Sequence, residues 1–311
     1  MKRREAVKHL ITAAAAPLIA GCGVDRLLQP QFEISSGAER ITLIGAGDQH
    51  AVLRPAARVR TAALVKSVLN ADPTAWAFSA GDLTHTGKAI EYQEYYHNTW
   101  GAFRERTLFA IGNHDVMYAS PPGAAYYAYT RAPKYYAKTL GTWRCYVLNC
   151  GNASQGGTDP AEQTAWLRAD LAQHSATHHI LAMFHYPMFA SICEHHLKAM
   201  TWPGRVGPWW QVLQEHGAEF VVSGHAHRWE RFSRKLRDGT VSEAGIRQFV
   251  VGTGGVLTRG IVSRHPDSES VVVEHGVVRY DLYPDRYEWT FINQWGVVRD
   301  SGTQSCRKVL A

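Results

Sequence analysis

Residues 41–50 read ITLIGAGDQH, an apolar stretch that passes directly into Gly47, Asp48, Gln49 and His50. Short apolar stretches of this kind are typical of buried parallel strands. Glycine at the end of a strand lets the backbone turn tightly, so that the next side chains can point into the space beyond the sheet. The sequence therefore predicts a buried strand over 41–46 with Asp48 and His50 at its carboxyl end.

Four later stretches repeat this arrangement. Apolar residues at 75–80, 107–111, 180–184 and 220–222 are followed, in turn, by Gly81-Asp82, Gly112-Asn113-His114-Asp115, His185 and Gly224-His225-Ala226-His227. The carboxyl ends of parallel strands meet along one edge of a sheet, so we expect these polar side chains to converge. Taken singly, each motif predicts no more than a turn or an ordinary polar residue.

Segments with helical spacing lie between these stretches, from Arg58, after Pro160 and after Pro208. Alternating strands and helices predict a layered α/β domain. From Arg247 onward, β-rich stretches at 249–251, 271–273, 277–282 and 287–292 are separated by turn residues. They predict antiparallel strands that close a second sheet.

The chain of 311 residues has no internal repeat and no long low-complexity linker. We expect one domain over 41–300, a signal segment at 1–22, a linker at 23–40 and a C-terminal tail at 301–311. The formal net charge is +6, but Lys and Arg are scattered along the chain. The charge favours anionic partners in general but by itself decides nothing, and we expect no specific nucleic-acid partner.

The N-terminus has the features of an export signal. Lys2, Arg3 and Arg4 precede an apolar run at 10–20, and small residues lead to Cys22. This ending resembles a bacterial lipoprotein signal with a lipid on Cys22, the one membrane contact we expect, and the paired arginines resemble a twin-arginine signal. The alternative is an ordinary cleaved signal with a chance cysteine. Either interpretation predicts an exported protein, periplasmic or membrane-anchored, in a bacterium.

Four cysteines remain after the signal segment: Cys145, Cys150, Cys193 and Cys306. In an oxidising compartment they could form two disulfides, with three possible connectivities. The absence of a Cys-x-x-Cys pair argues against a zinc ribbon.

Taken together, the five polar motifs resemble those of the calcineurin-like metallophosphoesterase superfamily. Residues 225–231 (HAHRWER) and 251–255 (VGTGG) further resemble its purple-acid-phosphatase-like branch. Five motifs in register are far more specific than one. The resemblance implies an α-β-β-α sandwich, in which two packed mixed β-sheets are flanked by helices.

The resemblance also implies a ligand set for two metal ions, divalent or of mixed valence. Asp48, His50 and His227 would hold the first ion, Asn113, His185 and His225 the second, and Asp82 would bridge both. Carboxylates, imidazoles and an amide oxygen suit Mn, Zn or Fe. The expected reaction is attack of a metal-bound hydroxide on phosphorus. His114 would stabilise the transition state or protonate the leaving oxygen, and Asp115 would orient His114.

One position departs from the purple enzymes. Three residues after the bridging aspartate they usually carry a tyrosine that binds ferric iron, whereas this chain has His85. We therefore expect a colourless site. His85 itself could bind metal, face the substrate or lie on the surface.

The leading functional hypothesis is an exported phosphomonoesterase that acts on phosphorylated small molecules. Phosphodiesterase or nucleotidase activity on the same metal core is the alternative, because the residues that discriminate these substrates lie on variable loops. A binding module that has lost its chemistry would show gaps among the ligands, and none is missing. The tyrosines at 92–96 and 126–136 could stack on bases, but we expect them to pack in the core.

Overall fold

The computed structural model describes residues 40–50, 55–151, 157, 159–308 and 310. The expected signal segment and all of the expected linker except Arg40 lie outside these residues. Among the described residues, no helix combines the length and the apolar character that a membrane crossing requires.

Two large mixed sheets form the centre of the molecule. The first has the strand order β16-β15-β14-β1-β2-β3 and the second has the order β13-β10-β11-β9-β6-β5-β4. The first sheet contains β1 (Ile41–Ala46), β2 (Trp76–Ala80), β3 (Thr107–Ala110), β14 (Gly276–Leu282), β15 (Arg286–Asn293) and β16 (Val298–Ser305). The second contains β4 (Tyr136–Leu140), β5 (Trp143–Val147), β6 (His179–Met183), β9 (Phe220–Ser223), β10 (Trp229–Phe232), β11 (Arg247–Val251) and β13 (Ser268–Val272). All five apolar stretches that precede the polar motifs are strands, as predicted.

The two sheets pack face to face through aromatic rings. Trp229 of β10 stacks on Phe291 of β15 with ring centroids 4.7 Å apart. The ring centroid of Phe220 in β9 lies 4.9 Å from that of Tyr280 in β14. Because the rings come from opposite sheets, their burial holds the sandwich together.

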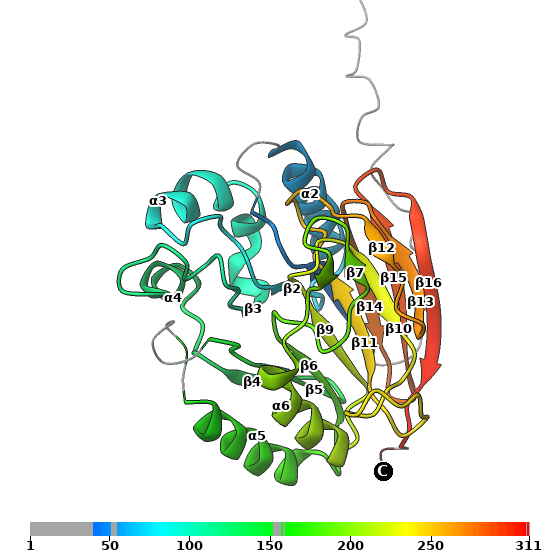
Figure 1. Cartoon of the computed structure of the whole chain (residues 1–311). Coiled ribbons are helices and arrows are strands. Elements are labelled where there is room, and N and C mark those ends of the chain that lie inside the picture. The colour runs from blue at the N-terminus through cyan, green and yellow to red at the C-terminus, as the bar shows by residue number, and fades with distance from the viewer. Residues whose placement is uncertain (1–39, 51–54, 152–156, 158, 309, 311) are drawn as a thin grey trace, which may run out of the picture.

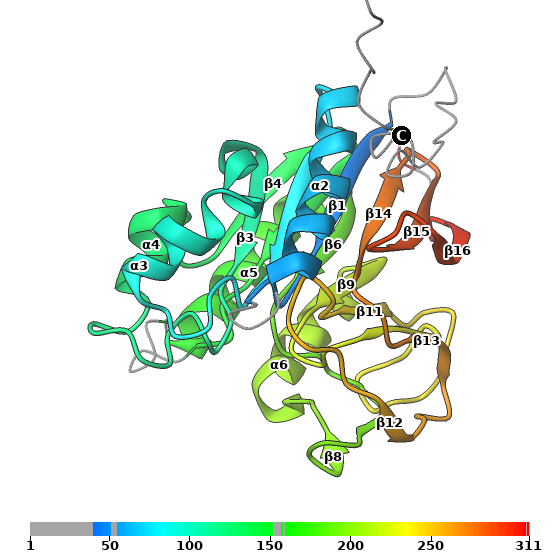
Figure 2. The same ribbon diagram turned by 90° about the horizontal axis from the view of Figure 1, so that it is seen from above.

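Helices cover the outer faces of both sheets. The helical segments are α2 (Pro55–Ala71), α3 (Ala89–Glu91), the π-helical turn η1 (Tyr92–Tyr96), the 3₁₀ segment η2 (Trp100–Arg106), α4 (Ala124–Thr130), α5 (Pro160–His174) and α6 (Pro203–Glu215). Helix α2 runs beside β1 (Figure 2), and α5 and α6 lie side by side next to β4, β5 and β6 (Figure 1). Leu167 and Leu171 of α5 and Trp209 and Leu213 of α6 are buried against the second sheet. The α-β-β-α sandwich is confirmed.

Helix α6 begins earlier than its sequence predicts. The expected start lay after Pro208, but the helix starts at Pro203 and Pro208 lies inside it. A proline there removes one backbone hydrogen bond near the start of the helix. The buried side chains of Val206, Trp209 and Trp210 hold the helix against the sheet despite this loss.

The C-terminal strands differ from the expectation of one antiparallel second sheet. Strands β14, β15 and β16 extend the first sheet, where Ile41 of β1 pairs with Leu282 of β14. Strand β11 joins the second sheet parallel to β9. The boundary expected at residue 300 falls inside β16, so residues 301–305 belong to the sheet and not to a tail.

The cysteines also differ from the two disulfides considered above. Cys145, Cys150, Cys193 and Cys306 are all unpaired thiols. The first three are buried, and burial raises the pKa of the Cys150 thiol to about 11. They behave as small apolar side chains of the interior.

The tyrosines pack as expected. Tyr92, Tyr96 and Tyr126 are buried in the main core together with Trp100. Tyr95 is an exception, with 45% of its surface exposed. Their main role is therefore structural.

Candidate metal centre

The five polar motifs converge at the carboxyl ends of β1, β2, β3, β6 and β9, where the two sheets meet. Backbone hydrogen bonds join the loops directly, because Asp48 N donates to Gly81 O at 2.8 Å and Gly224 N donates to His185 O at 3.0 Å. A third bond joins the two sheets, because Gly47 N after β1 donates to Val251 O at the end of β11 at 2.8 Å. Backbone hydrogen bonds alone therefore hold segments of both sheets together at this end of the molecule.

Two buried carboxylates lie at the centre. Each uses one oxygen to accept a backbone N–H, from His225 to Asp48 Oδ2 and from His114 to Asp82 Oδ1, both at 2.8 Å. The other oxygens, Asp48 Oδ1 and Asp82 Oδ2, are buried without a hydrogen-bond partner. A buried anionic oxygen without a partner is costly, so these two atoms fit a site for cations.

Imidazole nitrogens surround these oxygens. His227 Nε2 lies 3.4 Å from Asp48 Oδ1, and His185 Nε2 lies 3.3 Å from Asp82 Oδ2. His185 Nε2 also lies 3.1 Å from Asn113 Oδ1. The buried His225 Nε2 has no hydrogen-bond partner. The site therefore gathers the side-chain types that bind transition metals.

Backbone carbonyls fix the orientation of three imidazoles. The Nδ1 contacts are His50 to Asp82 O at 3.3 Å, His185 to Ala80 O at 2.8 Å and His227 to Leu257 O at 3.2 Å. A carbonyl can only accept, so each Nδ1 carries the proton. Each Nε2 is then the nitrogen left to bind a metal, as in many metal sites where a second hydrogen bond sets the tautomer.

The ligand atoms form two overlapping groups. Asp48, His50 and Asp82 place one ligand atom each within 4.8 Å of one another, and Asp82, His185 and His225 do the same. Asp82 belongs to both groups. The structure therefore brings together all seven residues of the expected ligand set, with His227 beside Asp48 and Asn113 beside His185.

Burial and charge shift the titration of these groups. Burial lowers the pKa of His50 to about 4 and that of His225 to about 3. Burial also opposes a charge on His185, but the Asp82 and Asp48 carboxylates outweigh it and raise its pKa to about 9. The two carboxylates thus favour positive charge at this position.

Three of the seven residues have strained backbones. Asp48, Asp82 and His225 adopt φ values of 60°, 58° and 66°, in the left-handed region that non-glycine residues rarely occupy. Such conformations cost roughly 1–2 kcal/mol each. Strain at three neighbouring ligand positions is typical of a functional site whose surroundings hold it in place.

Neighbouring glycines make room for the carboxylates. A Cβ atom on Gly112 would lie 2.1 Å from Asp82 Oδ1, and one on Gly224 would lie 2.5 Å from Asp48 Oδ2. Both distances are far below van der Waals contact. The glycines in these motifs are therefore needed for the close approach of a ligand.

The sequence model of the family described as Calcineurin-like phosphoesterase matches residues 41–229, more than half of the chain. This chain belongs to that family. The match begins with β1 and ends at the first residue of β10, so it contains all five polar motifs.

Curated relatives place this calcineurin-like phosphoesterase in the purple-acid-phosphatase-like branch. It is 27% identical to purple acid phosphatase 18 of Arabidopsis thaliana over 34% of this chain and 24% of that protein. It is 23% identical to purple acid phosphatase 1 of Ipomoea batatas over 50% of this chain and 36% of that protein. The match thus spans about a third or less of the length of these relatives.

Solved structures show the same fold. The purple acid phosphatase PPD1 of yellow lupin superposes with a TM-score of 0.72 at 16% identity, covering 86% of this chain and 54% of that one. GAP50 of Plasmodium, described as the anchor in the inner membrane complex, gives a TM-score of 0.65 at 10% identity and covers 87% of this chain and 90% of that one. At these identities the likeness concerns the fold alone.

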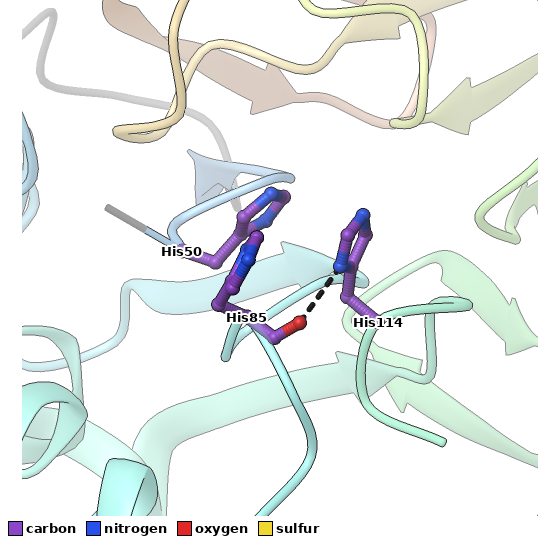
Figure 3. Close-up of side chains that lie close together, drawn as sticks. All are labelled: His50, His85 and His114. Carbon is purple, nitrogen blue, oxygen red and sulfur yellow. Dashed lines mark hydrogen bonds between the residues drawn. The ribbon is translucent and has the colours of Figure 1, made fainter. Parts of the chain in front are cut away.

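His114 lies beside the metal centre in a group of three rings (Figure 3). Its ring stacks on that of His50 at 4.4 Å between centroids and lies 5.2 Å from that of His85. His114 Nδ1 contacts the His85 carbonyl at 2.8 Å, so Nδ1 carries a proton and Nε2 remains for substrate. His85 itself is exposed, and its ring centroid lies 5.6 Å from that of His50.

Asp115 has partners other than the expected His114. Its carboxylate accepts the backbone N–H groups of Asp82, Leu83, Thr84 and Gly112 and the hydroxyl of Tyr92, at 2.9–3.2 Å. The orientation of His114 comes from the His85 carbonyl instead. Because Asp115 is fully buried and faces these backbone donors, it fixes the loop that carries Asp82.

Sequence reasoning missed three residues near the centre. Arg259 Nε lies 3.3 Å from His227 Nδ1, the nitrogen that faces Leu257 O. Tyr186 packs its ring edge-on against His225 at 4.7 Å, and Arg205 shares a cavity with His185. Tyr186 directly follows a recognised motif, which could have suggested it. Arg205 and Arg259 lie in segments with no comparable pattern.

Proposed function

We propose that this calcineurin-like phosphoesterase is a phosphomonoesterase that uses two metal ions. The observation that carries the proposal is the pair of buried carboxylate oxygens without partners, Asp48 Oδ1 and Asp82 Oδ2, surrounded by imidazoles. Asp48, His50 and His227 would hold one ion. The other would be held by Asn113, His185 and His225, with Asp82 shared.

When bound, two divalent ions would exceed the charge of the two carboxylates by about two units, attract phosphoryl oxygens and acidify the attacking water. Mn, Zn and Fe all suit this donor set. The chain itself fixes the arrangement, because backbone carbonyls hold the imidazoles and backbone N–H groups hold the carboxylates. Little reorganisation is then needed during the reaction.

In the reaction, the water oxygen forms a bond to phosphorus while the bond to the leaving oxygen breaks. The products are inorganic phosphate and an alcohol or phenol. His114 would stabilise the transition state or give a proton to the leaving oxygen from Nε2, while Nδ1 stays on the His85 carbonyl. His85 would face the substrate from the same wall.

The test compares p-nitrophenyl phosphate with bis-p-nitrophenyl phosphate, with and without a chelator. We expect metal-dependent hydrolysis of the monoester, lost in Asp82→Asn. The matched control is Asp285→Asn, since Asp285 is 73% exposed in the turn between β14 and β15, at the other end of the sheet. Activity on the diester alone would make the protein a phosphodiesterase, and activity that resists the chelator would contradict the metal mechanism.

We further propose that the protein acts outside the cytoplasm. The export-like segment at 1–22 supports this, although it lies outside the described residues. Cell fractionation of the full chain, alongside Cys22→Ser, tests the proposal. A lipid on Cys22 predicts membrane association that the variant loses, and accumulation of the wild-type protein in the cytoplasm would contradict export.

A further inference from the structure

A cavity of about 330 Å³ adjoins the metal centre, because two of its lining residues, Asn113 and His185, belong to the ligand set. One wall is apolar and is formed by Ile111, Val116, Met117 and Pro122. All four follow β3 on the segment that also carries Asn113. The cavity therefore begins at metal-binding side chains and is bordered directly by apolar ones.

The fold holds most of this apolar wall in place. Ile111 is buried in the main core, and Val116 packs against that core. Val116 N also lies 3.4 Å from Asn113 O, to which it donates in the turn after β3. Met117, in contrast, is 44% exposed, and its flexible thioether can adapt to the shape of a ligand. The wall thus combines fixed apolar side chains with an adaptable one.

Asn149 and Arg205, on the opposite wall, are engaged within the protein. Asn149 Nδ2 donates to Tyr127 OH and Asn149 Oδ1 accepts from Gly151 N, both at 2.8 Å. Arg205 Nη1 donates to Cys150 O at 2.6 Å. A hydroxyl group that entered the cavity would give up hydrogen bonds to water, whereas an apolar group would give up none. The lining therefore favours an apolar occupant.

A second cavity of about 470 Å³ continues from the first, with which it shares Asn149, Cys150, Gly151 and Arg205. Its other described lining residues are uncharged: Pro160, Trp202, Gly204, Pro208 and Trp209. Trp202 is 46% exposed and offers an open indole face. The two cavities form one groove from the metal centre toward the start of α6, and its apolar character continues away from the centre.

We propose that this groove binds the leaving group of the substrate and selects phosphomonoesters whose leaving group is an extended apolar chain. A phosphomonoester has a single organic part, so the group that extends from a metal-bound phosphate into this cavity is the leaving group. The chain loses contact with water as it fills the groove, which favours binding. The inference rests on the phosphomonoesterase function proposed above and goes beyond it by naming the substrate class.

The experiment compares ethyl, butyl, hexyl and octyl phosphate as substrates of the metal-loaded full chain. The four alcohols that leave have nearly the same basicity, so differences in kcat/KM report the binding of the chain. We expect kcat/KM to rise by about two- to fourfold with each methylene that the groove buries, mainly through a lower KM.

A second comparison separates apolar character from length. Pentyl phosphate and 4-hydroxybutyl phosphate have chains of equal length, but the second ends in a hydroxyl group in place of a methyl group. We expect the enzyme to favour pentyl phosphate by about tenfold in kcat/KM. Calorimetry gives a readout without turnover, in which hexylphosphonate should bind the metal-loaded protein more tightly than ethylphosphonate. Equal kcat/KM for the two five-atom chains, or equal binding of the two phosphonates, would overturn the apolar selection.

Met117→Ala assigns the selection to the apolar wall. The variant should lower the gain in kcat/KM from ethyl to octyl phosphate by about threefold or more, because the chain buries less apolar surface. Val298→Ala is the matched control, since Val298 is 52% exposed in β16, at the opposite edge of the first sheet from β3. It should leave the gain unchanged.

The outcomes separate this inference from the function on which it rests. A wild-type kcat/KM that does not rise with chain length would overturn the proposed groove, and a gain that Met117→Ala leaves intact would overturn the role of the apolar wall. Failure to hydrolyse p-nitrophenyl phosphate in a parallel assay would instead contradict the phosphomonoesterase function.

Discussion

At the scale of single residues, Asp82 depends on several neighbours at once. Its backbone is left-handed, His114 N donates to one carboxylate oxygen, and Gly112 leaves room for that same oxygen. The other oxygen has no hydrogen-bond partner. The residue is therefore held in a conformation that leaves this oxygen facing the His185 imidazole and suited to a bound cation.

Gly112→Ala tests this dependence. The added Cβ would lie 2.1 Å from Asp82 Oδ1, so Asp82 must move, at a cost of roughly 1–3 kcal/mol for the overpacking. We expect the variant to lose bound metal and activity, measured by elemental analysis and phosphatase assay. Gly204→Ala, where the added atom meets nothing within 4 Å, should keep its metal. Full metal occupancy in Gly112→Ala would contradict the packing argument.

His114→Ala separates chemistry from metal binding. The side chain contacts the His85 carbonyl and stacks on His50 but is outside the ligand set. We expect kcat to fall by roughly 10²–10⁴, as for the loss of a general acid, with metal content unchanged. His178→Ala, at the other end of β6, serves as the control. Near-normal kcat in His114→Ala would exclude this residue from the mechanism.

The polar motifs were readable from sequence because each residue follows an apolar strand within a few positions. Asp115 shows the limit of this reasoning. It was expected to orient its neighbour His114, but its carboxylate accepts from the loop after β2 and from Tyr92. Adjacency in sequence does not fix the direction of a side chain in a turn, and backbone N–H groups, which every residue except proline carries, cannot be recognised as partners from the sequence.

At the scale of elements, Asp115 connects the loop after β2 to the loop after β3. Asp115→Asn replaces one accepting oxygen with an N–H₂ donor that faces backbone donors. We expect this to lower the free energy of unfolding by roughly 1–3 kcal/mol and to weaken metal affinity through the Asp82 loop. Urea denaturation and metal titration measure the two effects.

Tyr92→Phe calibrates that result, since it removes a single donor from Asp115 at 2.9 Å and leaves the backbone contacts intact. Its effects on stability and metal affinity should be smaller than those of Asp115→Asn. Unaltered metal affinity in Asp115→Asn would show that the loop holds its shape without this carboxylate.

The elements themselves were predicted unevenly. Strands β1, β2, β3, β6 and β9 follow from local apolar patterns, as do α2 and α5. The pairing partners of the C-terminal strands could not be predicted from local patterns, because β14 pairs with β1 across more than 230 residues of chain. Local patterns identify a strand, whereas its sheet depends on such distant contacts.

At the scale of the whole molecule, the metal centre lies between the two sheets and should couple metal binding to global stability. Bound metal would offset the cost of the buried carboxylates and favour the folded state by about 2.7 kcal/mol at a hundredfold excess over Kd. For a domain of this size, we expect chelation to lower Tm by roughly 5 °C or more. In Asp82→Asn, which should bind metal poorly, adding the chelator should change Tm little. A wild-type Tm that does not respond to the chelator would contradict the coupling.

The cavity beside the centre, lined by Asn113, His185 and Arg205, also belongs to this scale. Arg205 enters it because α6 packs on the second sheet, and the contact with Cys150 O joins segments 55 residues apart. No local motif marks such a residue. The centre could therefore be predicted from sequence more fully than the cavity beside it.

The most direct test of the central claim is anomalous diffraction from crystals of the full chain grown with manganese or zinc. We expect two metal peaks about 3.5–4 Å apart, with the Asp82 carboxylate in contact with both. A single peak, no peak, or two peaks that leave Asp82 uncoordinated would contradict it.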